Sequence, residues 1–316
     1  MMKTKISFLF IAIIILSLAC SSCEDESKNS KKSQQAKEQS IDEGNLEVYV
    51  DTLLINMIEP VMDFYRQSYP KINLKVNYVN SRKAVALLFS GKAEAIVLSR
   101  NYLKDEDSLN KEYQLIRPEM EMAKDGLVFF HNGKIGLDTL NDEQIFNILT
   151  AGKNFKDYYS HLKVEPELVT TDINNSHYQN LINTAARNNK ITHKVKQLAS
   201  MQELIDYVSK NDNAIGVAYL SNVIKLSQLT KIRISFVNKQ GIRIPPQIVH
   251  QGFIVQEKYP YIITDKVILL EDRMNKPFWF ASYLSKETKV QKYFLDYGIV
   301  PAFAKIKLHE ADNEIK

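Results

Sequence analysis

Residues 46–99 read LEVYVDTLLINMIEPVMDFYRQSYPKINLKVNYVNSRKAVALLFSGKAEAIVLS, and the patterns in this stretch decide the fold class. Alternating or continuous apolar runs predict strands, and apolar residues spaced three or four apart predict helices. The patterns follow one another as strand, helix, strand, helix and strand over residues 46–50, 53–69, 74–79, 82–89 and 95–98. Alternation at this spacing favours an α/β fold in which helices cover a parallel sheet.

Pro60 falls inside the first of these helical patterns. Proline lacks a backbone N–H and is tolerated mainly in the first turn of a helix. We therefore predict that the helix is interrupted and that Glu59 and Pro60 begin a second helical piece.

The remainder of the chain predicts a second α/β unit and a mostly helical C-terminal third. A strand over residues 127–130 ends before Asn132 and Gly133, and Asn141 is a good N-cap for a helix that stops at Gly152. Further helices are predicted over residues 176–187, 201–209, 267–270, 278–284 and 290–297, a strand over 214–219, and a crossing back to the first unit over 242–250.

Residues 1–19 predict a lipoprotein signal peptide. A positively charged start precedes an apolar run over residues 6–18 that is too short for a comfortable membrane span. The small residues before Cys20 resemble the bacterial lipobox, so we predict that Cys20 is lipidated and anchors the chain to a membrane of the cell envelope, on its periplasmic or outer-membrane face. Cys23 is the competing acceptor, and an ordinary cleaved signal that leaves a soluble protein is the alternative.

Residues 20–44 are predicted to form a disordered tether, because they are rich in Ser, Lys, Glu and Gln and have almost no apolar side chains. This segment holds the only cysteines, Cys20 and Cys23, which excludes disulfides, thiol nucleophiles and Cys-ligated zinc from the predicted folded part. Cleavage after residue 19 leaves 39 basic and 37 acidic residues. This near-neutral balance argues against nucleic-acid binding.

The sequence supports an enzyme poorly. Its six histidines show no spacing typical of a metal site, and neither a Gly-x-Ser-x-Gly motif nor a phosphate-cradling loop occurs. Acidic pairs lie in the predicted tether or open a helix, where acids are expected for electrostatic reasons. We therefore predict a protein without catalytic activity, metal or cofactor.

Four further stretches are informative through their order and spacing along the chain. They are residues 122–129 with Asn132, 140–149 with Gly152, 213–219, and 291–294 with 297–301. Together they resemble the type II periplasmic-binding-protein family, and within it the phosphate-binding proteins of phosphate ABC transporters. The resemblance covers about residues 45–304. It implies an α/β fold with two lobes joined by two crossings and a ligand cleft between the lobes.

From this resemblance we predict lobe 1 over residues 45–133 and 240–316 and lobe 2 over residues 134–239. The lobes should close on a ligand by rotation about hinges near Gly133 and Gly241.

The predicted ligand site follows from the physics of helix ends. Helix N-termini present unpaired N–H groups and the positive end of a dipole, so several of them that converge make an anion pocket. The predicted ligand residues lie in four loops that match family positions: Asp51, Thr52 and Leu53, then Ser81 and Arg82, then Ser99 and Arg100, and finally Asp172, Asn174, Asn175 and Ser176. The resemblance implies phosphate or a related oxyanion as the ligand.

These loops also depart from the family pattern. None of them contains glycine, which lets a backbone approach an anion closely, and the fourth has Asp172 but no arginine. Asp51 is equally well interpreted as a helix cap, and residues 172–175 as a plain turn.

The two arginines of these loops have alternative partners as well. Arg100 has competing surface partners in Asp105 and Glu106, where an ion pair would contribute little. Arg82 opens a helix, where its charge is unfavourable, so an anion or a carboxylate is expected nearby.

Three functions remain open. The first is a monomeric, lipid-anchored solute-binding protein that captures phosphate or a related oxyanion and delivers it to an ABC permease. The second is the same fold with another small polar ligand, since Asp51 and Asp172 can accept hydrogen bonds from a protonated or cationic solute. The third is a surface lipoprotein with a vestigial cleft that acts in protein contact or sensing, which the acidic residues 24–26 favour because they resemble surface-export tags.

Overall fold

The computed structural model describes residues 41–115 and 117–303. The predicted signal peptide, the predicted lipidation at Cys20 and nearly all of the predicted tether lie outside these described residues. Within the two described ranges, no helix is both long and apolar enough to span a bilayer.

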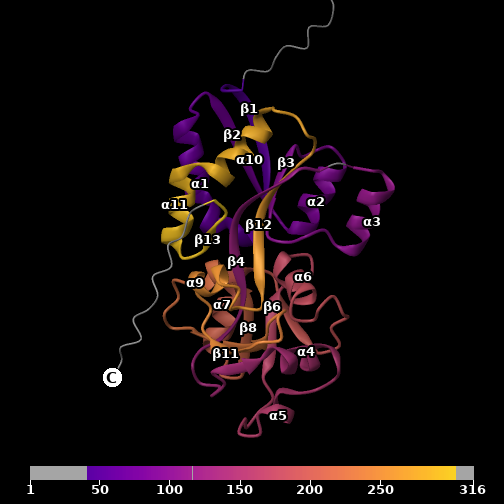
Figure 1. Cartoon of the computed structure of the whole chain (residues 1–316), viewed down its shortest axis with the longest axis vertical. Coiled ribbons are helices and arrows are strands. Elements are labelled where there is room, and N and C mark those ends of the chain that lie inside the picture. The colour runs from indigo at the N-terminus through magenta and orange to yellow at the C-terminus, as the bar shows by residue number, and fades with distance from the viewer. Residues whose placement is uncertain (1–40, 116, 304–316) are drawn as a thin grey trace, which may run out of the picture. The chain divides into compact units, whose positions relative to one another are not determined.

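Strands and helices alternate through the first part of the chain, as the sequence pattern predicts (Figure 1). The elements are β1 (Gly44–Asp51), the 3-10 turn η1 (Thr52–Leu54), α1 (Ile55–Ser68), β2 (Ile72–Val79), α2 (Ser81–Phe89), β3 (Ala95–Leu98) and α3 (Lys104–Glu112). Strand β1 lies between β2 and β3 and is parallel to both. The carboxyl ends of these three strands therefore lie at one edge of the sheet, where α/β proteins hold their ligands.

The predicted break at Pro60 is wrong, because α1 continues through it. Met57, Ile58, Val61 and Met62 flank Pro60 and are all buried on one face of the helix. Each buried apolar side chain contributes about 1.5–3 kcal/mol, so the four together outweigh a proline penalty of about 3 kcal/mol.

A second α/β arrangement follows along the chain. Its elements are β4 (Glu119–His131), β5 (Thr139–Asn141), α4 (Asp142–Thr150), α5 (Phe155–Tyr158), β6 (Glu167–Thr171), α6 (Ser176–Asn183), β7 (Val195–Leu198), α7 (Met201–Lys210), β8 (Ala214–Tyr219), α8 (Leu220–Val223), β9 (Thr230–Lys231), β10 (Arg233–Val237) and β11 (Arg243–Gln247). Strand β6 is parallel to its neighbours β7 and β8. Asn141 caps α4 as predicted, since its side chain accepts hydrogen bonds from the N–H groups of Glu143 and Gln144.

The last described elements are α9 (Gln251–Val255), β12 (Ile262–Leu269), α10 (Lys276–Lys286), α11 (Thr288–Tyr297) and β13 (Val300–Pro301). Two predictions are wrong in this part. Residues 267–269 end strand β12 instead of forming a helix, because a short apolar run does not distinguish a buried strand from a buried helix. Residues 243–247 form β11, which pairs with β10, so the crossing back is made by β12.

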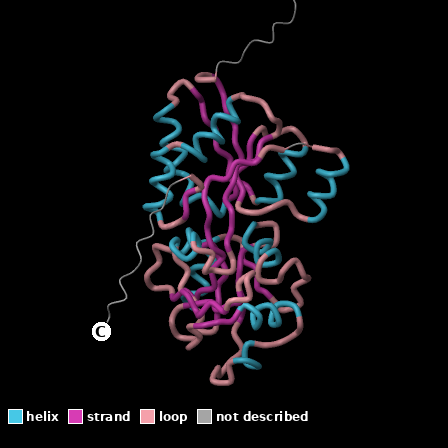
Figure 2. The backbone as a smooth tube through the Cα atoms, viewed as in Figure 1, coloured by secondary structure: helices cyan, strands magenta, loops and turns pink. Residues whose placement is uncertain are grey.

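Strands β4 and β12 run antiparallel to each other and connect two of the three hydrophobic cores. Figure 2 shows strands that run from one group of helices to the other. The first core packs α1, α10 and α11 against the first sheet and includes Met122 and Val267. The second core lies among the elements from β4 to β10 and includes Leu127 and Ile263. Each strand therefore passes from one core to the other within a few residues.

The predicted hinge glycines do not lie at these crossings. Gly133 follows the end of β4, and Gly241 lies in the turn between β10 and β11, both with positive φ. The crossings themselves lie near residues 124–126 and 264–266. The described residues belong to one compact unit, so the division into residues 45–133 with 240–316 and residues 134–239 stays a prediction.

Candidate ligand-binding site

The four predicted loops meet, because each follows a strand or opens a helix at the same edge. The hydroxyl of Ser176, at the start of α6, donates to the Asp51 carboxylate at the end of β1. The hydroxyl of Ser81, at the start of α2, donates to the carbonyl oxygen of Asn174 at 3.1 Å, and the backbone N–H of Arg82 donates to the same oxygen at 3.3 Å. Loops that are distant in sequence thus form one buried polar cluster.

Asp51 is completely buried at the centre of this cluster. Its Oδ1 atom accepts a hydrogen bond from the backbone N–H of Leu53 at 3.1 Å, so it also caps the start of η1. Burial raises the pKa of Asp51 to about 6, against the opposing effects of Ser176, Leu53 and the charge of Arg100. Asp51 therefore acts as a helix cap and also lies in the candidate ligand-binding site, so its two interpretations do not exclude each other.

Arg100 is also buried, with 2% of its surface exposed. Its guanidinium donates two hydrogen bonds to the Glu106 carboxylate, at 2.7 and 2.9 Å, and its Nε donates to the Ser81 hydroxyl at 2.9 Å. The expected pairing with Glu106 is present, but its expected surface position is wrong. Removing one partner of a buried bidentate pair costs far more than breaking a surface pair.

Arg82 turns toward the same carboxylate. Its Nη1 atom donates to Asp105 and to Glu106, each at 2.9 Å, and Asp105 also accepts from Nη2. The expected compensating carboxylate at the start of α2 is thus present, and hydrogen bonding to Arg82 lowers the pKa of Asp105 to about 2. Both arginines therefore neutralise acids of α3 in this structure.

Ser99 is held by a residue that the sequence analysis missed. Its hydroxyl donates to Oδ1 of Asp265 on β12 at 2.6 Å, and both side chains are fully buried. Burial, and then the charges of Asp125 and Asp51, raises the pKa of Asp265 well above its usual range. Among the described residues, Oδ2 of Asp265 has no hydrogen-bond partner.

The remaining predicted residues have mixed positions. Thr52 is exposed, whereas the Leu53 side chain packs in the second core. Asp172 accepts hydrogen bonds from the backbone and side-chain nitrogens of Asn174, at 2.8 and 2.9 Å. These contacts are those of a plain turn, the alternative interpretation of residues 172–175. Thr52, Asp172 and Asn175 nevertheless line one cavity of about 430 Å³ beside the cluster.

Helices α6 and α8 supply further polar residues that sequence reasoning missed. Asn180 donates to the carbonyl of Ser99 at 2.6 Å and to the Tyr219 hydroxyl at 2.8 Å. The side-chain nitrogen of Asn222 donates to the carbonyl of Leu53 at 2.7 Å, and its Oδ1 atom accepts from Nε2 of buried His177 at 2.8 Å. Asn180 lies one helical turn after Ser176, so the spacing on α6 was the signal that could have identified it.

Four buried carboxyl groups therefore lie in or beside the cluster, namely those of Asp51, Glu106, Asp125 and Asp265. In the part of the chain that the structure describes, no group of three or more His, Cys, Asp or Glu side chains is arranged to hold a metal ion. The arrangement instead offers hydroxyls, one arginine and carboxyl groups that can accept or share a proton.

This combination of two cores, two crossing strands and a buried polar cluster at strand ends defines a protein of the solute-binding fold class. The chain belongs to the PBP superfamily, whose domain model matches residues 32–276. No curated protein sequence matches it significantly.

Solved structures agree with this assignment at the level of the fold. A phosphate ABC transporter-type substrate-binding protein from Clostridium perfringens with bound phosphate has a TM-score of 0.65 at 13% identity, covering 82% of this chain and 99% of that one. An ABC-type phosphate transport receptor from Vibrio cholerae has a TM-score of 0.63 at 16% identity, covering 81% and 99%. PstS from Borrelia burgdorferi has a TM-score of 0.52 at 14% identity, covering 82% and 99%. At these identities the likeness concerns the fold alone.

Proposed function

We propose that this protein is a lipid-anchored, monomeric solute-binding protein that captures phosphate or a related tetrahedral oxyanion and delivers it to an ABC permease. The observation that carries the proposal is the meeting of three serine hydroxyls, those of Ser81, Ser99 and Ser176, with Arg100 and Asp51 in one buried cluster. Hydroxyls and a guanidinium donate to oxyanion oxygens, and a carboxylate accepts the proton of a protonated phosphate. The fold shared with phosphate-binding receptors supports the same ligand class.

Binding requires the direct contacts across the cluster to separate. The Ser176 hydroxyl must leave Asp51, and the Ser81 hydroxyl must leave the Asn174 carbonyl, so that both can donate to the ligand. Arg100 keeps its charge beside the site through its Nε contact with Ser81. These protein contacts would be exchanged for contacts to the oxyanion.

One observation favours a second candidate, a protonated or cationic polar solute. Each of the three serine hydroxyls already donates to a protein acceptor, and both arginines are paired with carboxylates. With its donors occupied, the cluster presents mainly acceptors, and these suit a solute that carries N–H or O–H groups.

Isothermal titration of the purified protein with phosphate, arsenate and sulfate separates these candidates. We expect phosphate and arsenate to bind and sulfate to bind more weakly, since sulfate lacks a proton for Asp51 near neutral pH. If no oxyanion binds at millimolar concentration, the oxyanion proposal fails, and a protonated or cationic polar solute or an interaction module with a vestigial cleft becomes the better proposal.

A further inference from the structure

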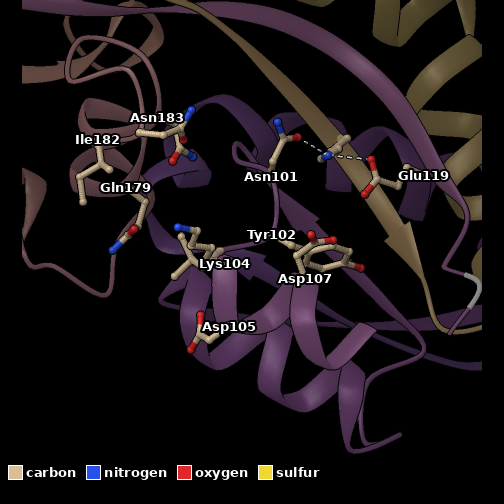
Figure 3. Close-up of a pocket in the computed structure, with 12 residues that line it drawn as sticks. Asn101, Tyr102, Lys104, Asp105, Asp107, Glu119, Gln179, Ile182 and Asn183 are labelled. Atoms are coloured by element: carbon tan, nitrogen blue, oxygen red, sulfur yellow. Dashed lines mark hydrogen bonds and ion pairs between the residues drawn. The ribbon is translucent and has the colours of Figure 1, made fainter. Parts of the chain in front are cut away.

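A polar cavity of about 710 Å³ lies beside the candidate site (Figure 3). One wall is formed by residues 101–105 and 107, in the loop after β3 and the first turn of α3, together with Lys266 of β12. The facing wall belongs to α6 and includes Gln179 and Asn183. Elements of both cores therefore border this cavity, as they border the candidate site.

Several polar side chains of these walls have no partner in the part of the chain that the structure describes. The Tyr102 hydroxyl is buried without a hydrogen-bond partner among the described residues. Within the described ranges, the side chains of Lys104 and Asn183, which Figure 3 labels, form neither a hydrogen bond nor an ion pair, and nor does the side chain of Asn188. Polar groups in a cavity that are not used by the protein are available to a ligand.

The acidic groups on the walls are neutralised already, whereas Lys104 keeps its charge unpaired among the described residues. Asp105 is paired with Arg82, Asp107 with Lys111, and Glu119 with the buried Lys266 at 2.6 Å. A second anionic group on a ligand would be repelled by these three carboxylates. Neutral hydroxyl groups suit the walls better, because a hydroxyl donates to carboxylates and exchanges hydrogen bonds in both directions with amides.

The cavity adjoins the candidate site, because on two elements the residues that line it are next to site residues in the chain. Asn101 lines the cavity and follows Arg100 in the chain, and its carbonyl accepts a hydrogen bond from Arg100 at 2.8 Å. On α6, Asn180 contacts the candidate site, whereas its neighbours Gln179 and Asn183 line the cavity.

A free oxyanion would leave this space unused. The cavity volume of about 710 Å³ corresponds to roughly twenty water molecules at about 30 Å³ each. That is enough for an organic group larger than the oxyanion itself.

We infer that the ligand is a phosphate monoester of a small sugar or polyol, with its phosphate in the candidate site and its neutral, hydroxyl-bearing part in this cavity. The inference rests on the proposed function, because the phosphate end uses the same serine and arginine groups. The amides of Asn183 and Asn188 and the Tyr102 hydroxyl bind the hydroxyls of the organic part.

Titration of the purified full-length protein with inorganic phosphate, glucose 6-phosphate and glucose tests this inference. We expect glucose 6-phosphate to bind at least roughly tenfold more tightly than inorganic phosphate, since several hydrogen bonds are added. Asn183→Ala should weaken glucose 6-phosphate binding by roughly threefold to tenfold and leave phosphate binding unchanged. Lys104→Met, at an exposed position, should act in the same direction, because the Lys104 ammonium group lines the cavity and can donate to a hydroxyl of the ester; this variant serves if Asn183→Ala folds poorly.

Asn73→Ala is the matched control, because Asn73 is an exposed asparagine on β2 that contacts Asn45 and lines neither the cavity nor the site. If inorganic phosphate binds as tightly as glucose 6-phosphate, or if both cavity variants bind the ester normally, the inference is overturned and the proposed function stands. If neither phosphate nor the ester binds, the proposed function fails and the inference fails with it.

Discussion

Asp125 and Asp265 lie on the same face of two adjacent strands, diagonally across the point where β4 and β12 pass between the cores. Asp265 lies opposite Ala123, and Asp125 lies opposite Ile263, so the two carboxyl groups are diagonal neighbours. Both side chains are completely buried. Burial raises the pKa of Asp125 to about 6 and that of Asp265 well above its usual range, to which the nearby Asp125 carboxyl adds.

Asp265→Asn should stabilise the protein at pH 8 but not at pH 4. A carboxyl whose pKa is raised by folding contributes stability below its unfolded pKa and loses that contribution as the pH rises through its folded pKa. Asparagine keeps an oxygen for the Ser99 hydroxyl and cannot ionise. We expect a gain of about 1–3 kcal/mol in the free energy of unfolding at pH 8, measured by urea denaturation from pH 4 to 8.

Asp206→Asn provides the comparison, since Asp206 is exposed on α7. Its pH profile should parallel that of the wild type. If the pH profile of the free energy of unfolding of Asp265→Asn also parallels that of the wild type, the buried carboxyl pair does not influence stability.

Arg100→Met should destabilise the protein substantially, contrary to what a surface position would imply. The substitution leaves Glu106 buried without one of its two arginines and removes the Nε contact with Ser81. Breaking a buried ion pair costs about 3–5 kcal/mol, and Arg82 on the same carboxylate should keep the loss near the lower end. The double variant Arg100→Met with Glu106→Gln should recover part of the loss in thermal melting, and a single variant as stable as the wild type would contradict the buried pair.

The local pattern of the first sheet was predictable because its strands and helices have clear periods. Residues 95–98 of the first sheet form a strand with the predicted bounds, and so do residues 214–219 in the second α/β arrangement. Strand β12 was missed because its apolar run at residues 267–269 is too short to reveal its period. The continuation of α1 through Pro60 was missed because the rule that proline interrupts a helix considers only the local sequence. Burial of the apolar side chains around Pro60 outweighs the penalty in the folded protein.

The candidate site was predictable only as far as it depends on strand ends. Asp51, Ser81, Ser99 and Ser176 were found because they follow strands or open helices. Asp265 was missed because it lies inside a strand that joins the site by long-range pairing, so no local motif marks it. Which carboxylate neutralises which arginine also depends on the packing of α3 beside α2.

Cys20→Ser should release the protein from the membrane fraction. We expect the lipid chains to supply the attachment, at about 0.8 kcal/mol per buried CH₂ group. Fractionation of cells followed by detection of the protein gives the measurement. A variant that still sediments with membranes would point to Cys23 or to an anchor other than lipid.

Closure on a ligand should bend the chain at residues 124–126 and 264–266, where both strands leave one core for the other. Small-angle scattering should show a more compact particle with saturating phosphate than without it. Gly241→Ala, in the turn between β10 and β11, should leave this difference unchanged. Identical scattering profiles with and without bound phosphate would rule out closure, and loss of closure in Gly241→Ala would restore the hinge predicted there.

Asp51→Asn should shift the binding preference of the protein from phosphate toward sulfate. Asparagine can keep both present contacts, because its oxygen accepts from the Leu53 N–H and its nitrogen can donate to the Ser176 hydroxyl. It cannot accept the proton of phosphate as a carboxylate does, so phosphate affinity should fall by roughly tenfold, while sulfate affinity should rise.

The pH dependence of sulfate binding has a definite sign, since Asp51 has a pKa of about 6. As the pH falls from 7 to 5, wild-type Asp51 takes up a proton and can then donate to sulfate, so wild-type sulfate affinity should increase while that of the variant stays constant. Titrations with sulfate at pH 5, 6 and 7 measure this, and equal pH profiles for the two proteins would mean that Asp51 does not contact the ligand.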